Sequence, residues 1–246
     1  RDDSRGQAAV QALEKEGLHP KYHQLDINDH SSIVRLRDFL QNTYQGLDVL
    51  VNNAGILYQS ELHSEVPATA PFPEMAEKTC QTNFFATLDV CEVLFSILRP
   101  HARVCNMSSG LGRWSLEKVS QSLKDRLLSS DIDMEELINI VRSFVKAAQE
   151  DKHLEQGFSD NAYGMSKLCL TVMSTIQQRE LDKKGAEDIV VNACTPGLVA
   201  TDMTNHKGIT IDEGAVTPVF AVLLPPNISE PRGKFLRNKE ISEGMK

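Results

Sequence analysis

The chain has 246 residues, 41% of them hydrophobic, and its 26 basic and 34 acidic residues give a formal net charge of −8. This length suits one α/β domain, and the hydrophobic content excludes an intrinsically disordered chain. The acidic balance and the lack of a basic run argue against nucleic acid or an anionic membrane as partner, and no apolar stretch approaches the ~18 residues that span a bilayer.

The first predicted elements are a helix over residues 4–17 and a short strand over residues 22–26, ending in an acid. A second helix is predicted from Ser31 or Ser32 as N-cap, because apolar residues follow at helical spacing. The apolar run at residues 47–51 is typical of a strand that is buried on both faces of a parallel sheet.

The later elements continue the alternation. A long helix is predicted over residues 80–98, ended by Pro100, and a strand over residues 103–107. A helix over residues 163–183 and a strand over residues 188–194 follow. Strands that alternate with helices predict an α/β fold with a doubly wound, Rossmann-like parallel sheet.

One long stretch, between Ser109 and Tyr163, interrupts this alternation. It holds a predicted helix after Ser130 with apolar residues at positions i, i+3, i+4 and i+7, so one face should dock on the main body. We therefore expect a single domain over residues 1–246 with a helical insertion at about 113–160. The alternative is a solvated surface insertion without a catalytic part.

The segment Tyr163-Gly164-Met165-Ser166-Lys167 carries the strongest chemical signal. If it is helical, Tyr163 and Lys167 lie one turn apart on the same face. A nearby ammonium favours the phenolate and lowers the pKa of a tyrosine, so the pair could donate a proton to a carbonyl oxygen that receives hydride at its carbon. The alternative is a half-exposed aromatic beside a solvated lysine.

Several small or polar residues follow directly after predicted strands. Asn52 to Gly55, Ser108-Ser109 and Pro196-Gly197 come after three of these strands, and Asp26 ends the first. Ligands of a doubly wound sheet bind beyond the carboxyl ends of its strands, so these residues indicate a ligand site. Each motif taken alone is also typical of a turn.

Together these motifs resemble the short-chain dehydrogenase/reductase family over essentially the whole chain. The resemblance rests on Asn-Asn-Ala-Gly after a strand, Ser109, Tyr163-x-x-x-Lys167 and Pro196-Gly197-x-Val199-x-Thr201. Finer features resemble the NADPH-dependent carbonyl reductases of animals. They are the opening Arg1-Asp2, the runs at residues 23–27, 82–85 and 223–226, and the insertion before Tyr163.

The resemblance implies four catalytic roles. Tyr163 would be the proton donor, and Lys167 would hold the nicotinamide ribose and lower the Tyr163 pKa. Ser109 would hydrogen-bond the substrate carbonyl, with Ser108 as the weaker candidate. Asn83 would hold a water that relays protons to Lys167, although a structural hydrogen bond is the alternative for a buried mid-helix asparagine.

The resemblance also implies a cofactor site for NADPH. Asp26 and Ile27 would flank the adenine, Asn53, Ala54 and Gly55 would line the ribose, and the segment Pro196, Gly197, Val199 and Thr201 would contact the nicotinamide amide. Instead of binding cofactor, Asp26 could be an acid at the start of a helix, and Thr201 could be a helix N-cap. Arg1 would contact the 2′-phosphate, or be a frayed end without function.

The sequence departs from the family pattern in two places. No glycine-rich strand–loop–helix precedes the first helix, so we expect a longer parent protein whose first strand and pyrophosphate loop lie outside this chain. Leu198, at the border of the substrate pocket, stands where these carbonyl reductases often have a large aromatic residue. Substrate range therefore does not follow from the resemblance.

The function expected from the resemblance is reduction of ketones, aldehydes or quinones by NADPH. The alternatives are another short-chain alcohol or hydroxysteroid dehydrogenase, and a catalytically inactive fragment that acts as a binding module. We also expect a monomer, because in this family the insertion covers the surface through which tetrameric relatives pair.

The five cysteines are scattered and odd in number, without a C-x-x-C pair. This usage favours reduced thiols, and therefore the cytoplasm, over a disulfide framework or a zinc site. Cys194 lies near the expected ligand site, where it is either a reactive thiol or a buried structural cysteine.

Overall fold

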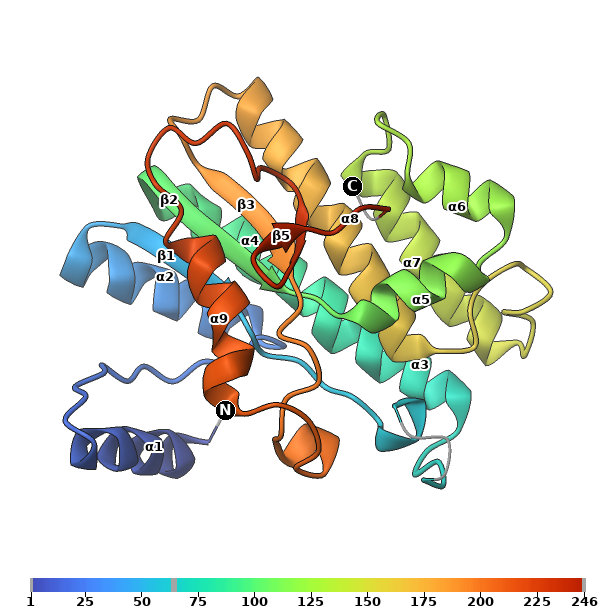
Figure 1. Ribbon diagram of the computed structural model, residues 1–246, viewed down its shortest axis with the longest axis horizontal. Helices are drawn as coiled ribbons and strands as arrows, with labels where there is room; N and C mark the ends of the chain where they lie inside the picture. The colour runs from blue at the N-terminus through green and yellow to red at the C-terminus, as the bar shows by residue number, and fades with distance from the viewer. Residues whose placement is uncertain (1, 63–65, 245–246) are drawn as a thin grey trace.

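The structure, a computed structural model, describes residues 2–62 and 66–244 and is built around one five-stranded sheet (Figure 1). The strands lie in the order β1-β2-β3-β4-β5, with the first four parallel and β5 antiparallel to β4. Their bounds are β1 Leu47–Asn52, β2 Leu98–Met107, β3 Val190–Cys194, β4 Phe235–Arg237 and β5 Glu240–Ile241.

The three long strands end at the same edge of the sheet. Asn52 of β1 is opposite Asn106 of β2, and Met107 of β2 is opposite Cys194 of β3. The polar residues that follow these strands therefore lie at one carboxyl edge, as their positions in the sequence predict.

Helices cover both faces of the sheet. In Figure 1, α9 lies in front of the sheet, and α2, α4 and α8 lie behind it. Their bounds are α2 His30–Tyr44, α4 Ala86–Leu94, α8 Ala162–Lys183 and α9 Ile211–Val222. This arrangement confirms the predicted doubly wound α/β fold. Helix α1 (Asp3–Lys15) contributes no buried residue.

The stretch between β2 and α8 forms three helices beside the sheet. These are α5 (Gly110–Lys118), α6 (Gln121–Leu127) and α7 (Met134–Gln149). The apolar face of α7 packs with α3 (Phe72–Cys80) and α8 in the main hydrophobic core, so the predicted docking of this helix is confirmed. The sequence analysis missed α5 and α6, two short helices that begin at serine N-caps.

Two predicted elements near the start are wrong or displaced. Residues 22–26 run without strand pairing, because no other strand of the described chain lies beside them. Helix α2 begins after Asp29, whose carboxylate accepts a hydrogen bond from the Ser31 backbone N–H at 3.0 Å. Its N-cap is therefore an aspartate rather than Ser31 or Ser32.

The helix predicted over residues 80–98 has different ends and a local irregularity. The helical stretch begins with α3, passes through a π-turn (η2, Gln81–Phe85) into α4, and ends with a 3₁₀ turn (η3, Phe95–Ile97). Pro100 lies inside β2, where the register with β1 shifts between Leu98 and Arg103. Proline is tolerated at such an irregularity because no ladder hydrogen bond is required of it.

Strand β1 is less buried than its apolar sequence predicts. Val49 and Val51, which point to the same face of the sheet, are each 41% exposed. Strand β1 has a neighbour on one edge only within the described part of the chain. Two short 3₁₀ turns, η1 (Gln59–Glu61) and η4 (Asp202–Thr204), complete the elements.

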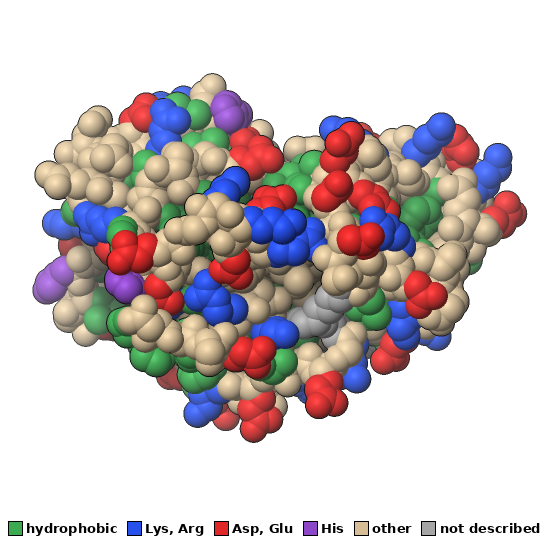
Figure 2. Space-filling model, turned by 90° about the horizontal axis from the view of Figure 1, so that it is seen from above, with side chains coloured by type: hydrophobic (Ala, Val, Ile, Leu, Met, Phe, Trp, Pro, Cys, Tyr) green, Lys and Arg blue, Asp and Glu red, His purple; other side chains and the backbone are tan. Residues whose placement is uncertain are grey.

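The surface agrees with the charge of the sequence. On the face drawn in Figure 2, acidic and basic side chains alternate without a continuous basic band. None of the helices in residues 2–62 and 66–244 is long and apolar enough to cross a bilayer. The same residues hold no cluster of histidine, cysteine or carboxylate side chains suited to a metal ion.

Candidate active site

Ser109, Tyr163 and Lys167 lie together at the carboxyl edge of the sheet. Ser109 follows β2 and is the N-cap of α5, while Tyr163 and Lys167 lie on the first turns of α8. The Ser109 hydroxyl lies near enough to the Tyr163 hydroxyl to affect its pKa. The Lys167 ammonium lies 5.6 Å from the centre of the Tyr163 ring, so both side chains share one helix face as predicted.

Close packing of α5 on α8 brings Ser109 over Tyr163. A Cβ atom on Gly112 of α5 would lie 2.8 Å from the Leu168 backbone nitrogen. A Cβ atom on Gly164 of α8 would lie 2.8 Å from the Leu111 carbonyl oxygen and closer still to Ser115 Oγ. Both contacts are shorter than real Cβ contacts, so glycine is required at these two positions for the helices to approach.

Burial controls the ionisation of Tyr163. The side chain is 9% exposed, and loss of solvation raises its pKa to about 12, while the neighbouring Ser109 hydroxyl acts in the lowering direction. The expected lowering of the Tyr163 pKa by Lys167 is not found. The Lys167 ammonium donates a hydrogen bond to the Met107 carbonyl at 2.6 Å and lies over the ring of Tyr163. Tyr163 therefore holds its proton throughout the neutral range.

Lys167 is a buried cation. Its side chain is almost fully enclosed, and burial lowers its pKa to about 8. An ammonium has three donor hydrogens. Among the described residues the only hydrogen-bond acceptor found for it is the Met107 carbonyl. Two donors thus remain for a ligand that enters from the carboxyl edge.

Asn83 joins the loop after β1 to α8. Its side-chain oxygen accepts from the Ile56 backbone N–H at 2.8 Å, and its amide nitrogen donates to the Ile56 carbonyl at 2.9 Å and to Ser166 Oγ at 3.1 Å. These bonds match the structural alternative considered for this residue. The neighbouring Gly55 lies so close that a Cβ there would be 3.4 Å from the Lys167 ammonium.

The other predicted cofactor residues after β1 and β3 lie at the same edge. Asn53 and Ala54 are exposed and directly follow β1. After β3 the chain turns at Gly197, which has a left-handed φ of 83°. Pro196, Val199 and Thr201 are partly buried in the returning loop. Thr201 is the N-cap of η4, which is the structural role considered for it as the alternative to a cofactor contact. Leu198 is 42% exposed on this loop.

Asp26 and Ile27 lie in the turn that leads into α2. The Asp26 carboxylate accepts a hydrogen bond from the Asn28 backbone N–H at 3.0 Å, so it stabilises the turn before α2, whereas the acid that caps the helix is Asp29. Ile27 packs against the small core formed by Ile33, Val90 and Leu94. Arg1, the predicted contact for a 2′-phosphate, lies outside the described residues.

Ser108 and Cys194, the two other candidates near this edge, have structural roles. Ser108 Oγ donates to the Lys167 carbonyl at 2.8 Å and is bonded to Thr171 Oγ1 at 2.7 Å. Cys194 is fully buried, and its Sγ lies 3.2 Å from that of Cys105. This contact and burial raise the pKa of the Cys194 thiol, which agrees with a structural cysteine rather than a reactive one. All five cysteines are free and buried.

The sequence analysis missed Glu61. One carboxylate oxygen accepts a hydrogen bond from the Tyr163 backbone N–H at 2.8 Å, and the other is buried without a hydrogen-bond partner among the described residues. Burial raises the pKa of this carboxyl. A single acid in a short 3₁₀ turn has no periodicity or motif, and its contact with a residue about a hundred positions later leaves no signal in one sequence.

The residues at this edge fit a flat ligand with hydroxyl groups. Lys167 offers donor hydrogens, and Gly55 allows the backbone to approach Lys167 closely. The exposed backbone of Asn53 and Ala54 adds donors and acceptors. This combination suits the ribose of a nicotinamide cofactor.

Known proteins resemble this chain in sequence and in fold. Residues 1–121 match the family described as short chain dehydrogenase. NADPH carbonyl reductase 3 of Rattus norvegicus is 45% identical over 243 residues, which cover 98% of this chain and 86% of that protein. NADPH carbonyl reductase 1 of Homo sapiens is 44% identical over 245 residues, which cover 99% and 86%. The chain belongs to the short-chain dehydrogenase/reductase family.

A solved structure gives the same assignment. Salutaridine reductase from Papaver somniferum superimposes with a TM-score of 0.83 and 28% sequence identity, covering 96% of this chain and 88% of that one. The resemblance recognised in the sequence motifs is therefore confirmed at the level of the family and its fold.

Proposed function

We propose that this protein is an NADPH-dependent carbonyl reductase that converts ketones, aldehydes or quinones to alcohols. The proposal is supported by the 44–45% identity to two proteins named as NADPH carbonyl reductases. The single observation that carries it is the grouping of Ser109, a protonated Tyr163 and the buried Lys167 at one point of the carboxyl edge. A proton donor and a second hydroxyl directed at one point are what carbonyl reduction requires.

In this proposal NADPH, when bound, supplies the hydride to the carbonyl carbon. Ser109 hydrogen-bonds the carbonyl oxygen and stabilises the negative charge that develops there. Tyr163 transfers its hydroxyl proton to the same oxygen, which leaves an alcohol and a phenolate. Lys167 does not lower the Tyr163 pKa in this structure, so its part in the proposal is to hold the nicotinamide ribose next to Tyr163. Asn83 keeps the loop at Gly55 and Ile56 against α8, so its water-relay role remains a prediction.

The cofactor contacts are proposed along the carboxyl edge. Lys167 would donate to the nicotinamide ribose, Asn53 to Gly55 would line a ribose, and Val199 and Thr201 would contact the nicotinamide amide. Asp26 and Ile27 would flank the adenine, and Arg1 would contact the 2′-phosphate. Leu198, exposed on the loop after β3, would border the substrate pocket.

A panel of carbonyl compounds tests the reaction. NADPH oxidation should depend on an added ketone, aldehyde or quinone and should be faster than NADP⁺-dependent oxidation of the matching alcohols near neutral pH. Faster alcohol oxidation would favour a hydroxysteroid or other alcohol dehydrogenase. Absence of saturable NADPH binding, followed by the cofactor's fluorescence, would favour the inactive binding module.

We also propose a monomer in the cytoplasm, built as one domain with its insertion at about 113–160. The shared core of α7, α3 and α8 supports one domain, and the five buried thiols agree with a reducing compartment. Sedimentation should give a mass near 27.4 kDa at micromolar concentration. A tetramer would contradict the proposal.

A further inference from the structure

A second cavity lies away from the carboxyl edge, on the outer side of α8. Its volume is about 610 Å³, within the range of about 300–1,000 Å³ typical of small-molecule sites. Its walls come from α5, α6, the loop after α6, residues 168–183 of α8 and residues 232–234. Ser109 and Tyr163 do not line it.

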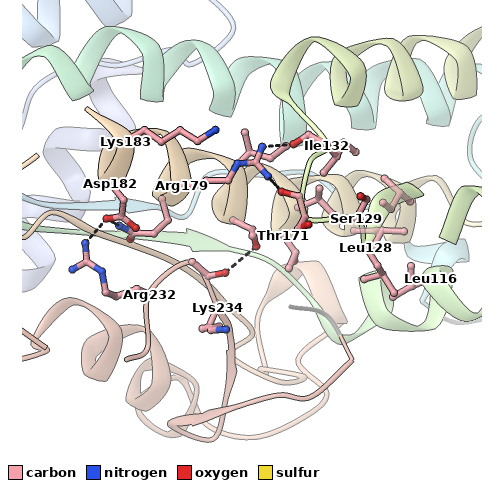
Figure 3. A pocket seen from close by; sticks show the side chains of 18 residues that line it. Leu116, Leu128, Ser129, Ile132, Thr171, Arg179, Asp182, Lys183, Arg232 and Lys234 are labelled. Carbon is pink, nitrogen blue, oxygen red and sulfur yellow. Dashed lines mark hydrogen bonds and ion pairs between the residues drawn. The ribbon is translucent and has the colours of Figure 1, made fainter. Parts of the chain in front are cut away.

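The cavity is amphipathic along its length. Figure 3 shows Leu116 and Leu128 at one end and Lys183, Asp182 and Arg232 at the other. The apolar end continues into the core, because lining residues such as Leu127, Leu168 and Ile176 are almost fully buried. A ligand that fills it therefore needs an apolar body and a polar head at opposite ends.

The polar end is positively charged, although the protein as a whole carries −8. Four cations line the cavity, Arg179, Lys183, Arg232 and Lys234, against one acid, Asp182. Asp182 already pairs with Arg232 at 2.6 Å, and Lys234 has a partner outside the lining, Glu230, at 3.7 Å. Charge complementarity thus favours an anionic head group.

Arg179 and Lys183 carry the excess charge. Arg179 donates to the backbone carbonyls of Ser130 and Ile132, and its Nε is buried without a hydrogen-bond partner in the described part of the chain. Arg179 and Lys183 lie one turn apart on α8. Among the described residues no carboxylate forms an ion pair with either of them. Arg179 is partly buried and Lys183 is exposed, so a bound carboxylate could reach both and would supply the counter-ion that neither has among the described residues.

We propose that this cavity binds a small amphipathic anion, a carboxylate with an aliphatic body. The aliphatic part lies between α5, α6 and α8, and the carboxylate lies near Arg179, Lys183 and Lys234. The site is distinct from the proposed active site and does not depend on the proposed reaction.

Calorimetric titration of the whole chain with octanoate tests the site. Octanoate should bind saturably at one site, and octylammonium, with the same tail and the opposite charge, should bind at least about tenfold more weakly. The comparison is stringent because a chain of charge −8 attracts the cation non-specifically. Absence of saturable octanoate binding, or equal affinity for the two compounds, would overturn the proposal.

Two variants locate the binding. Lys183→Gln with Lys234→Gln should weaken octanoate binding roughly tenfold through lost charge. The matched control, Lys152→Gln with Lys184→Gln, removes the same charge from positions outside the lining and should bind normally. Equal affinity in both double variants would place octanoate elsewhere and reject the site.

Filling the cavity gives an independent test. Val172 lines the cavity from α8, and Val172→Phe should abolish binding while the protein still unfolds cooperatively. Unchanged octanoate binding in a folded Val172→Phe protein would also reject the site. Should this variant not fold, the two charge variants decide the question.

Discussion

The carboxylate of Glu61 accepts a hydrogen bond from the backbone N–H of Tyr163 at 2.8 Å. The contact lies at the N-terminus of α8, where unpaired backbone N–H groups and the helix dipole favour negative charge. Asn161, the N-cap of α8, also donates from its side chain to the Glu61 carbonyl at 2.9 Å. Glu61 thereby fixes the turn η1 against the residue that we propose as proton donor.

The negative charge of Glu61 should hold Tyr163 in its protonated form. The Glu61 carboxylate acts in the direction that raises the Tyr163 pKa. Glu61→Gln keeps an acceptor for the Tyr163 N–H but removes the charge, so the phenolate should form at lower pH. We expect alcohol oxidation, which needs the phenolate, to be roughly threefold faster in Glu61→Gln at about pH 9.

A surface glutamate provides the matched control for this change. Glu77 is exposed on α3, so Glu77→Gln should leave the pH profile of oxidation unchanged. An identical profile for wild type and Glu61→Gln would remove Glu61 from any electrostatic role at Tyr163.

The pH dependence of reduction should report on Lys167. With a pKa of about 8, Lys167 loses its charge above that pH, whereas Tyr163, with a pKa of about 12, stays protonated. We expect kcat/KM for reduction to be level below about pH 8 and to fall up to about tenfold per pH unit above it. A profile that stays level to about pH 10 would show that the lysine charge is not needed.

Lys167 should also lower the stability of the fold. Its pKa falls from 10.5 to about 8 on folding, so between these values the unfolded chain binds more protons. Stability therefore rises as the pH increases from about 8 to about 10.5. We expect Lys167→Met to be inactive and to be more stable than wild type by about 3 kcal/mol at pH 7, in chemical denaturation.

The control for Lys167→Met is the same measurement at high pH. The difference should shrink as the pH rises from about 8 to about 10.5 and level off above that, where Lys167 loses its proton in both states. A variant that is less stable than wild type at pH 7 would mean that the hydrogen bond to Met107 outweighs the desolvation cost.

The chemistry at the carboxyl edge was predictable because it depends on local patterns. Buried parallel strands read as apolar runs, and residues that follow them must share one edge of the sheet. Asn53, Ser109 and Pro196 could be placed in this way. The spacing of Tyr163 and Lys167 followed from helical periodicity alone.

Features that depend on distant partners were not predictable. The strand expected at residues 22–26 needs a neighbouring strand, which its own sequence cannot supply. Pro100 looked like a helix stop but lies at an irregular point of β2. Glu61 contacts Tyr163 only through tertiary packing, and no local pattern indicates such a contact.

The close contact between α5 and α8 should be sensitive to a single methyl group. Gly112→Ala would place a Cβ 2.8 Å from the Leu168 backbone nitrogen, which cannot move without moving Lys167. We expect thermal unfolding to show a loss of about 1–3 kcal/mol, together with reduced activity. Gly110→Ala, whose Cβ would meet nothing within 4 Å, should be neutral or slightly stabilising. Equal stability of the two variants would contradict the close approach.

The central claim is that Tyr163 donates the proton in an NADPH-dependent reduction, and Tyr163→Phe tests it most directly. The phenylalanine keeps the ring beneath the Lys167 ammonium and removes only the hydroxyl. We expect steady-state NADPH oxidation with a carbonyl substrate to fall by at least about a hundredfold, while NADPH binding stays within about threefold of wild type. Wild-type turnover by the Tyr163→Phe protein would contradict the account.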